Sequence, residues 1–281
     1  MSFQQFASNH GLIIKRLDAS GRINRCGTTS HPNTKNGSYC FDGQNGWVQN
    51  WEVLDEPVWY ADEKEFTPAE KSAWLEKKRE QDRLIAKARK EAAENSAKVL
   101  ESCELLEHSY LEEKGFKNEK GLVISTQERD FLIVPMYGMA TEELTGCQYI
   151  SEEDGMFQKR FATGMRAEYS VHRIGRGKLN ILCEGYATGL SLAKAAKMSC
   201  MDVSIVVCFS AGNMGKVAKL VGDVVAADND KSGTGERAAQ STGLPYLMPD
   251  VVGKDWNDVH QSDGIFNVVQ AVKKMGKLAV R

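Results

Sequence analysis

Uninterrupted apolar runs recur through the C-terminal part of the chain, and helical spacing follows most of them. The runs "LNILC", "VSIVVCF" and "DVVAAD" alternate with segments of helical pattern, and "LPYLM" forms a fourth run. Strands that lack polar alternation and are separated by helices are typical of a parallel sheet covered on both faces. The pattern therefore predicts an α/β domain with a mainly parallel sheet over residues 180–281, ending in a helix at "DGIFNVVQAVKKMG".

Two earlier parts of the chain have the pattern of short strands separated by turns. In residues 1–60, "GLIIKRLDASGRINRC" and "GSYCFDGQNGWVQNWEV" each predict a pair of strands joined by a Gly-containing turn. In residues 116–179, "DFLIVPMYG" and "LTGCQYIS" predict strands, and "EEDGMF" predicts a hairpin turn before "QKRFAT". We therefore expect a small β-rich N-terminal domain and a β-rich subdomain directly before the α/β domain.

Residues 61–115 predict a long connecting helix between these parts. Thr67 followed by Pro68 marks its start, with the Thr as the capping residue. A narrow, partly apolar stripe then recurs at steps of three or four residues: Ile85, Ala88, Ala92, Ser96, Val99, Cys103, Leu106 and Tyr110. The other face is charged, which favours a solvated connector over a direct nucleic-acid contact. Gly115 is the predicted end of the helix, and the whole chain is predicted to be α+β.

The charge distribution narrows the classes of function. The chain of 281 residues has a formal net charge of −2, so any nucleic-acid surface must be local. Between Lys159 and Lys178, six Lys or Arg residues stand against a single acid, Glu168. Such a segment can be a solvated face or a binding surface for nucleic-acid or nucleotide phosphates. Because this basic segment contrasts with the rest of the chain, a phosphate-binding surface is supported as strongly as a solvated face.

The ends and the cysteines of the sequence indicate a cytoplasmic location. The N-terminus has no basic start followed by an apolar core, so no signal peptide is expected. No apolar run reaches about 18 residues, so no membrane partner is expected. The seven cysteines are scattered and never form a C-x-x-C pair, which is typical of reduced thiols.

Carboxylates stand where the predicted strands of the α/β domain end. Glu184 ends the first strand, Asp228 and Asp230 end the third, and Asp255 and Asp258 follow in "KDWND". The carboxyl ends of parallel strands meet at one edge, where ligands bind. Clustered carboxylates repel one another unless a cation compensates, and oxygen ligands suit Mg²⁺ or Mn²⁺. The alternative is that the D-x-D pair only caps a turn or a helix start.

These motifs together carry a resemblance to a known family. "ILCEGYATGLSLAKA", "VVCFSAGNMGKVAK" and "VVAADNDKSGTGERAA" resemble the Toprim domain of primases, topoisomerases and some nucleases, and look closest to the Toprim primases of phages and conjugative plasmids. "FLIVPMYG", "LTGCQYIS" and "DGMFQKRFATG" are similar to the segment before Toprim in those primases, and "YLEEKGF" to a phrase of theirs. "GRINRC" and "NGSYCFDGQNGWVQNW" are similar to their small DNA-contacting domain. The resemblance is strong over residues 116–258 and looser elsewhere.

The resemblance implies roles for the acidic residues. Glu184 matches the glutamate proposed as general acid or base, and Asp228 and Asp230 match the metal-binding pair. Asp255 and Asp258 match the later acidic positions of primase Toprim domains. The implied reaction is two-metal nucleotidyl transfer with Mg²⁺ or Mn²⁺. The sequence departs from some Toprim domains at Thr188, where they carry an Asp, which implies fewer ligands for the second metal.

The resemblance also implies partners. The expected function is a DNA primase that makes short RNA primers on single-stranded DNA from ribonucleoside triphosphates, encoded by a phage or plasmid and working with a separate replicative helicase. The alternatives are a Toprim nuclease and a non-catalytic accessory protein that binds single-stranded DNA. The basic residues expected to hold template phosphates or the incoming nucleotide are Lys159, Arg160, Arg166, Arg173 and Lys231.

The N-terminal domain raises two further questions. Related primases bind zinc there, and this chain offers His10, Cys26, His31 and Cys40. Structural zinc sites pair ligands at short C-x₂₋₄-C spacing, so ordinary thiols are favoured over zinc. The aromatic residues of the domain could stack on single-stranded bases, but a role in its core is favoured. These residues are Tyr39, Trp47 and Trp51.

Overall fold

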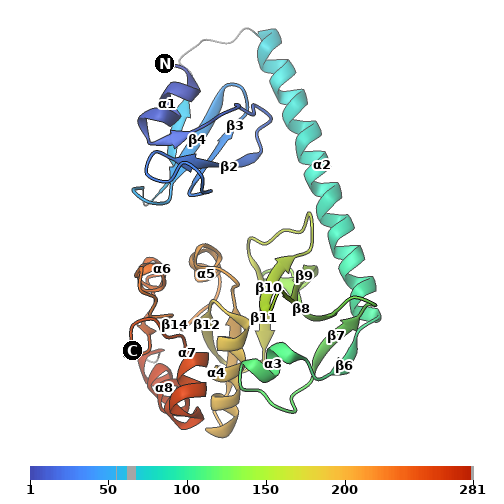
Figure 1. Cartoon of the computed structure of the whole chain (residues 1–281), viewed down its shortest axis with the longest axis vertical. Coiled ribbons are helices and arrows are strands. Elements are labelled where there is room, and N and C mark those ends of the chain that lie inside the picture. The colour runs from blue at the N-terminus through green and yellow to red at the C-terminus, as the bar shows by residue number, and fades with distance from the viewer. Residues whose placement is uncertain (55, 62–67, 280–281) are drawn as a thin grey trace. The chain divides into compact units, whose positions relative to one another are not determined.

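The computed structural model describes residues 1–54, 56–61 and 68–279. The chain divides into two compact units, Met1–Lys78 and Arg79–Arg281. Helix α2 (Pro68–Glu101) begins in the first unit and ends in the second (Figure 1). The predicted capping residue Thr67 lies outside the described residues. No helix in the described part of the chain is long and apolar enough to cross a membrane.

The first unit contains a five-stranded antiparallel sheet with one short helix packed on it. The order is β1-β2-β3-β4-β5. Helix α1 places Phe3 and Phe6 against Tyr39 and Tyr60. The described elements are α1 (Phe3–Asn9), β1 (Leu12–Ile13), β2 (Ile23–Thr28), β3 (Gly37–Phe41), β4 (Asn45–Asn50) and β5 (Val58–Ala61). The four predicted strands are confirmed, whereas α1 and β5 were not predicted.

The aromatic residues of this unit divide between its core and its surface. Tyr39 is 3% exposed and belongs to the core, as predicted. Trp51 is 58% exposed, so its predicted place in the core is wrong. The core is filled instead by the phenylalanines of α1, which cover the same sheet face as Tyr39.

The second unit is built on one continuous sheet. Its strand order is β10-β9-β8-β11-β13-β12-β14-β15, with β7 also paired to β8 and β6 to β7. The strands are β6 (Glu104–Leu106), β7 (Gly121–Ser125), β8 (Asp130–Gly138), β9 (Leu144–Glu153), β10 (Met156–Phe161), β11 (Ser170–Ile174), β12 (Leu179–Cys183), β13 (Val203–Val207), β14 (Val224–Ala226) and β15 (Tyr246–Leu247). Strands β13, β12, β14 and β15 are parallel, and the others pair antiparallel. The predicted α+β class with a mainly parallel C-terminal sheet is confirmed.

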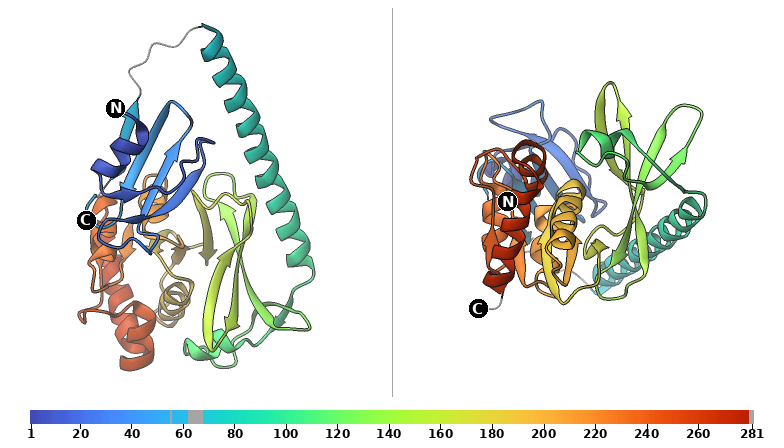
Figure 2. Two further views of the ribbon diagram at one scale, coloured as in Figure 1. Left: turned by 45° about the horizontal axis from the view of Figure 1, so that its top comes forward. Right: turned by 90° about the horizontal axis from the view of Figure 1, so that it is seen from below.

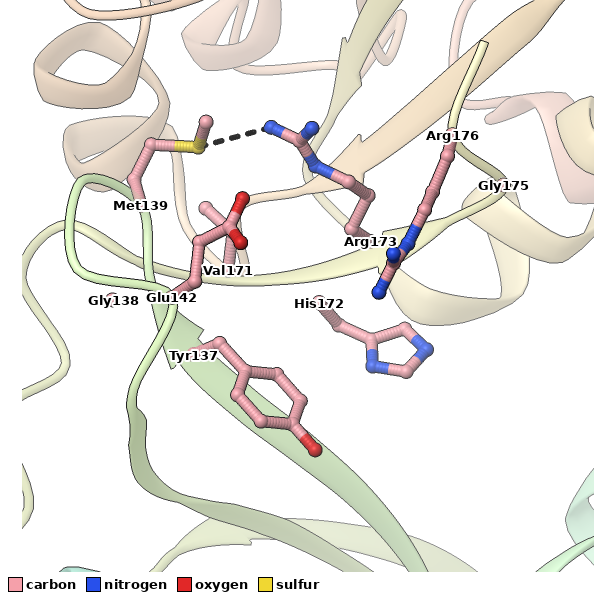
Figure 3. Close-up of a pocket in the computed structure, with 9 residues that line it drawn as sticks. All are labelled: Tyr137, Gly138, Met139, Glu142, Val171, His172, Arg173, Gly175 and Arg176. Carbon is pink, nitrogen blue, oxygen red and sulfur yellow. Dashed lines mark hydrogen bonds between the residues drawn. The ribbon is translucent and has the colours of Figure 1, made fainter.

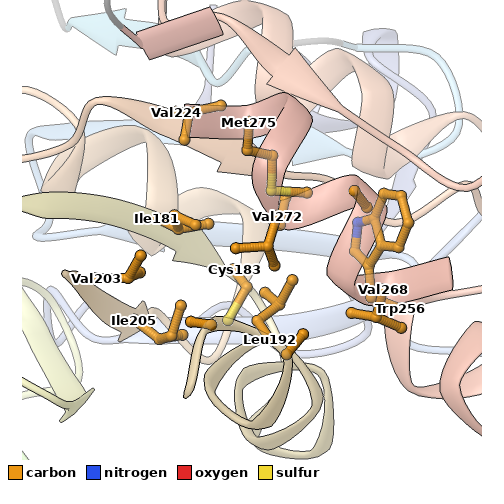
Figure 4. Close-up of a cluster of buried hydrophobic side chains, with 14 of the residues drawn as sticks. Ile181, Cys183, Leu192, Val203, Ile205, Val224, Trp256, Val268, Val272 and Met275 are labelled. Carbon is orange, nitrogen blue, oxygen red and sulfur yellow. The ribbon is translucent and has the colours of Figure 1, made fainter. Parts of the chain in front are cut away.

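Helices cover both faces of the parallel part (Figures 1 and 2). On one face α4, α7 and α8 bury residues such as Leu192, Trp256 and Val272 against Ile181 (Figure 4). On the other face α5 and α6 pack on alternate residues of the same strands, including Leu182. The helices are α3 (Ser109–Glu113), α4 (Tyr186–Met198), α5 (Ala211–Val217), α6 (Thr234–Ser241), α7 (Trp256–Asp263) and α8 (Ile265–Ala279). Burial on both sides explains the unbroken apolar runs of the sequence.

The long helix ends earlier than predicted. It stops at Glu101 rather than at Gly115, and β6 follows it. The reason is that residues 104–106 pair with β7, which satisfies their backbone groups, whereas the apolar stripe has little to pack on at this point. Leu105 is 63% exposed and Leu106 is 38% exposed. Gly115, with φ of 84°, instead follows the short helix α3.

Strand β11 joins the β-rich half to the parallel half. It pairs antiparallel with β8 on one side and with β13 on the other. This strand was not predicted, and the predicted boundary between residues 179 and 180 falls within a single sheet. The loop before β11 is held to the end of β13 by Asn213, whose Nδ2 donates to the carbonyls of Ser170 (2.8 Å) and Cys208 (2.9 Å). Its Oδ1 accepts from the backbone N–H of Tyr169 at 2.7 Å.

We predict that Asn213→Ala destabilises the second unit. The substitution leaves one buried backbone donor and two acceptors without their side-chain partner, which costs about 2 kcal/mol or more of unfolding free energy. Chemical denaturation measures the change, with Asn33→Ala as control because Asn33 is exposed. Equal stability of both variants would contradict the structural role of Asn213.

Candidate active site

Glu184 lies directly after β12, the strand flanked by β13 and β14. Its carbonyl accepts the N–H of Phe209 at 2.8 Å, and Phe209 has φ of 64°, in the left-handed region that non-glycine residues seldom adopt. Burial raises the pKa of the Glu184 carboxyl, the charge of Asp230 raises it further, and Lys159 opposes this. The strand end is therefore held in an unusual backbone conformation beside a partly desolvated acid.

Asp228 follows β14, and of the five carboxylates it has the least favourable electrostatic environment. Its Oδ1 is buried and has no hydrogen-bond partner. Burial, together with the charges of Asp255, Glu184, Asp230 and Asp258, raises the pKa of Asp228 to about 7. A buried carboxylate oxygen without a donor, surrounded by like charges, is unfavourable unless a cation or a proton compensates.

Asp230 has the opposite surroundings, although a single residue separates it from Asp228. Its Oδ1 accepts from the N–H of Ser232 (2.9 Å) and of Thr234 (3.1 Å), and its Oδ2 from the N–H of Gly235 (2.6 Å). The Ser232 hydroxyl also donates to it, and together these donors lower the pKa of Asp230 to about 2. Asp230 therefore organises the turn that opens α6.

Gly235 lets this turn approach the end of β14. A Cβ at this position would lie 2.3 Å from the Asp228 carbonyl oxygen. The glycine is thus required by close backbone contact, and the contact places both aspartates at the same strand end.

Asp255 and Asp258 form a capping box at the start of α7. The N–H of Asp258 donates to Asp255 Oδ1 at 2.8 Å, and the N–H of Asp255 donates to Asp258 Oδ2 at 3.0 Å. The preceding loop is tied to the end of β14 by Asn229, whose N–H donates to the Lys254 carbonyl at 3.1 Å. Asn229 also accepts from the Gly253 N–H at 2.5 Å. The spacer of the D-x-D motif therefore connects the two acidic segments.

Lys159 brings a positive charge to this acidic edge from β10. Its Nζ lies 5.3 Å from the centre of the Tyr110 ring. Burial and the charge of Lys114 lower the pKa of Lys159, whereas Asp255 and Asp228 raise it. The strand of the β-rich half thus contributes to the same site as the ends of β12 and β14.

The other predicted basic residues have different surroundings. Arg160 follows Lys159 in β10, so it points to the other face, and it pairs with Glu153 through distances of 2.5 and 2.6 Å. Arg166 lies over the ring of Tyr169, 5.5 Å from its centre. Arg173 lies within β11 and lines a separate cavity. Lys231 is exposed directly after Asp230.

Several residues of the site were not predicted. Asn229, Phe209 and Tyr110 act through backbone conformation or through contacts between distant segments, which leave no local sequence signal. Thr188, where some Toprim domains have Asp, is 1% exposed, and its Oγ1 is buried without a hydrogen-bond partner.

The acidic edge fits a divalent cation in its chemistry. In the described part of the chain, no group of three or more His, Cys, Asp or Glu side chains is arranged so that it could hold a metal ion. Asp230, Asp255 and Asp258 instead accept backbone hydrogen bonds. Asp228 Oδ1 nevertheless has no hydrogen-bond partner and lies near other carboxylates. A hard cation such as Mg²⁺ would supply the missing partner for this oxygen. Metal binding by these residues stays a prediction.

Three of the four candidate zinc ligands of the first unit, His10, His31 and Cys40, contact protein partners. His10 Nδ1 lies 2.9 Å from the Phe6 carbonyl, and His31 Nδ1 lies 2.8 Å from Glu52 Oε1. The thiol of Cys40 donates to the Gly21 carbonyl at 3.1 Å. The preference for ordinary thiols over zinc stays a prediction.

We predict opposite effects on stability for the two aspartates of the motif in metal-free buffer. The pKa of Asp228 is raised from 3.8 to about 7. Its contribution to the free energy of unfolding is therefore fully present below pH 3.8 and is lost as the pH rises through 7. At pH 8, Asp228→Asn should therefore stabilise the protein by on the order of 3 kcal/mol. The pKa of Asp230 is lowered to about 2, so its contribution is present above pH 3.8 and Asp230→Asn should destabilise.

Thermal unfolding in chelator at pH 5 and pH 8 measures these effects. The advantage of Asp228→Asn should be larger at pH 8 than at pH 5, because the carboxyl of the unsubstituted chain is largely protonated at the lower pH. A loss of stability in both variants at pH 8 would refute the assignment.

Comparison with known proteins identifies part of the chain. Residues 180–265 match the Toprim domain family, and no curated protein matches the chain. The match covers β12, β13, β14 and β15 with the helices between them, and it includes all five carboxylates of the acidic edge. Toprim domains in general bind Mg²⁺ and are usually catalytic on nucleic acids. Residues 180–265 of this chain are therefore a Toprim domain, the domain shared by primases, nucleases and topoisomerases.

Proposed function

We propose that this protein is a DNA primase that synthesises short RNA primers on single-stranded DNA by nucleotidyl transfer. Its substrates would be ribonucleoside triphosphates, and its setting would be phage or plasmid replication with a separate helicase. Mg²⁺ or Mn²⁺ would be the metal. The two alternatives are a Toprim nuclease and a single-stranded-DNA-binding accessory protein without catalysis.

The observation that supports this proposal best is the position of Lys159. It comes from the β-rich half, yet its charge acts on Glu184, Asp228 and Asp255 at the Toprim edge. Strand β11 joins both halves in one sheet, so the upstream strands are a fixed part of the site. A polymerising enzyme needs a basic residue from outside the Toprim domain to hold a triphosphate, whereas a stand-alone Toprim nuclease does not need the upstream strands.

The side chains suit the steps of nucleotidyl transfer. Burial raises the pKa of the Glu184 carboxyl above its ordinary value, which suits a group proposed to accept and return a proton. Asp228, with its orphaned oxygen, would hold the cation together with Asp230, Asp255 and Asp258. A bound divalent ion would activate the attacking hydroxyl and offset charge on the leaving pyrophosphate. Lys159 would neutralise a phosphate oxygen of the nucleotide.

The intact set of carboxylates favours an enzyme over a passive binding protein. The unsatisfied oxygen and the raised pKa of Asp228 are unfavourable for stability. Such strain is typical of functional sites, where it is offset on binding a ligand.

The test supplies single-stranded DNA, Mg²⁺ or Mn²⁺ and labelled ribonucleotides. We expect short RNA products from the unsubstituted chain and their loss, by at least about 10³-fold, in Glu184→Ala and Asp228→Ala. Asp250→Ala is the control because Asp250 is an exposed acid outside the acidic edge. Shortening of DNA without synthesis would favour the nuclease, and binding with neither product would favour the accessory protein.

A second prediction separates the neighbouring residues Lys159 and Arg160. Lys159→Met should reduce kcat by about 10²-fold, because it removes the positively charged side chain at the acidic edge. Arg160→Met should change kcat little, because Arg160 is paired with Glu153 on the other face of β10. Steady-state primer synthesis measures both, and equal losses would contradict the different roles of these residues.

A further inference from the structure

A cavity of about 420 Å³ lies between the turn that joins β8 to β9 and strand β11 (Figure 3). From β11 and the loop after it come Arg173 and Arg176, and from β8 and its turn come Tyr137, Met139 and Glu142. None of these residues belongs to the acidic edge. The cavity therefore lies outside the acidic edge, and of the basic residues expected from the sequence to hold phosphates it contains Arg173.

The guanidinium of Arg173 forms no salt bridge with a described residue, although Glu142 lines the same cavity. Among the described residues its polar partner is the sulfur of Met139, 3.6 Å from Nη2, and no carboxylate forms a salt bridge with it. The side chain is partly buried. A guanidinium carries five N–H donors, and a thioether is a weak acceptor, so most of this hydrogen-bonding capacity is unused. A partly desolvated, unpaired cation is unfavourable unless an anion joins it.

The rest of the lining suits an anion with several acceptor oxygens. Arg176 adds a second guanidinium, which also forms no salt bridge with a described residue. His172 is held by the Pro135 carbonyl at 2.9 Å, and burial lowers its pKa, so it adds no charge at neutral pH. Glu142 is the lone acid of the lining and is exposed. The balance of the lining is thus positive.

The cavity runs along β11, from the carboxyl end of β13 toward its amino end. In the antiparallel pairing His172 faces Val207, at the carboxyl end of β13, and Ile174 faces Ile205. The chain then continues toward the amino end of β13, where a Cβ on Gly175 would lie 2.8 Å from the Val203 carbonyl oxygen. The loop that carries Arg176 therefore lies at the edge opposite to Glu184 and Asp228.

We infer that this cavity binds a phosphate group through Arg173 and Arg176, with the exposed ring of Tyr137 beside it. Two guanidinium forks match the several oxygens of a phosphate better than those of a single carboxylate, and Arg pairs with phosphate in bidentate geometry. The phosphate can belong to a free nucleotide or to a nucleic-acid strand, and both share this recognition chemistry. The inference does not depend on the proposed polymerisation.

The test uses the full chain without divalent cation and compares Arg173→Gln and Arg176→Gln with Lys178→Gln. Lys178 is an exposed lysine of the same loop that does not line the cavity, so its variant removes the same charge. Titration calorimetry measures binding of pyrophosphate, a ribonucleoside triphosphate and a short oligodeoxynucleotide. We expect Kd to rise at least about tenfold in both arginine variants and by much less in Lys178→Gln.

The ligand series distinguishes the sources of the phosphate. If the arginine variants weaken the binding of pyrophosphate and of the triphosphate, the ligand is a free nucleotide. If they weaken the binding of the oligonucleotide alone, the ligand is a nucleic-acid strand. Either result supports the site. Equal losses in all three variants, or no binding of any of these ligands by the unsubstituted chain, would overturn it.

Thermal unfolding separates a binding role of Arg173 from a structural one. Without phosphate, Arg173→Gln should keep or raise the melting temperature, because it removes an unpaired and partly buried charge. A clear fall in melting temperature would show that the side chain supports the fold, and would also overturn the inference. Because binding is measured without metal, failure of primer synthesis leaves this result unaffected.

Discussion

The parallel pairing of β12 with both β13 and β14 is the constraint on which the site depends. It places Cys183 opposite Ala226, so the chain leaves both strands at the same edge and Glu184 and Asp228 emerge together. The hydrogen bonds of Asn229 with the loop before α7 then bring Asp255 to that edge. Because the faces of this sheet are buried under helices, the strand ends are the part that can present carboxylates to a ligand.

Bringing these carboxylates together has an electrostatic cost that the structure distributes unevenly. The Ser232 hydroxyl and backbone N–H groups stabilise the charge of Asp230, and the carboxylates of Asp255 and Asp258 accept the hydrogen bonds of the capping box. Asp228 receives no such donor at its buried oxygen. One residue therefore concentrates the repulsion, which makes it the point where a cation would be most favourable. The neighbouring residues are fixed before any ligand binds, as pre-organised sites require.

The β-rich half and the Toprim domain act as one body because β11 joins them in a single sheet. This continuity has two consequences. It fixes Lys159 beside the acidic edge, and it creates the arginine-lined cavity where β11 meets the turn after β8. Lys159 lies at the acidic edge, whereas the loop that carries Arg176 lies at the amino end of β13, so the two positive sites would hold different parts of a charged ligand or different ligands.

The sequence by itself determined the parallel sheet and the identity of its edge carboxylates, because burial on two faces leaves unbroken apolar runs and parallel strands end at a common edge. Those signals are local, so they can be recognised in one segment without knowing which other segment it packs against. Only the tertiary structure decided where α2 ends, that β11 joins the two halves, and that Lys159 rather than Arg160 faces the acids. It also showed that Asp228 has a buried oxygen without a hydrogen-bond partner, whereas Asp230 accepts several hydrogen bonds. These outcomes depend on pairing between segments far apart in the chain, and a run of side-chain types carries no record of such pairing.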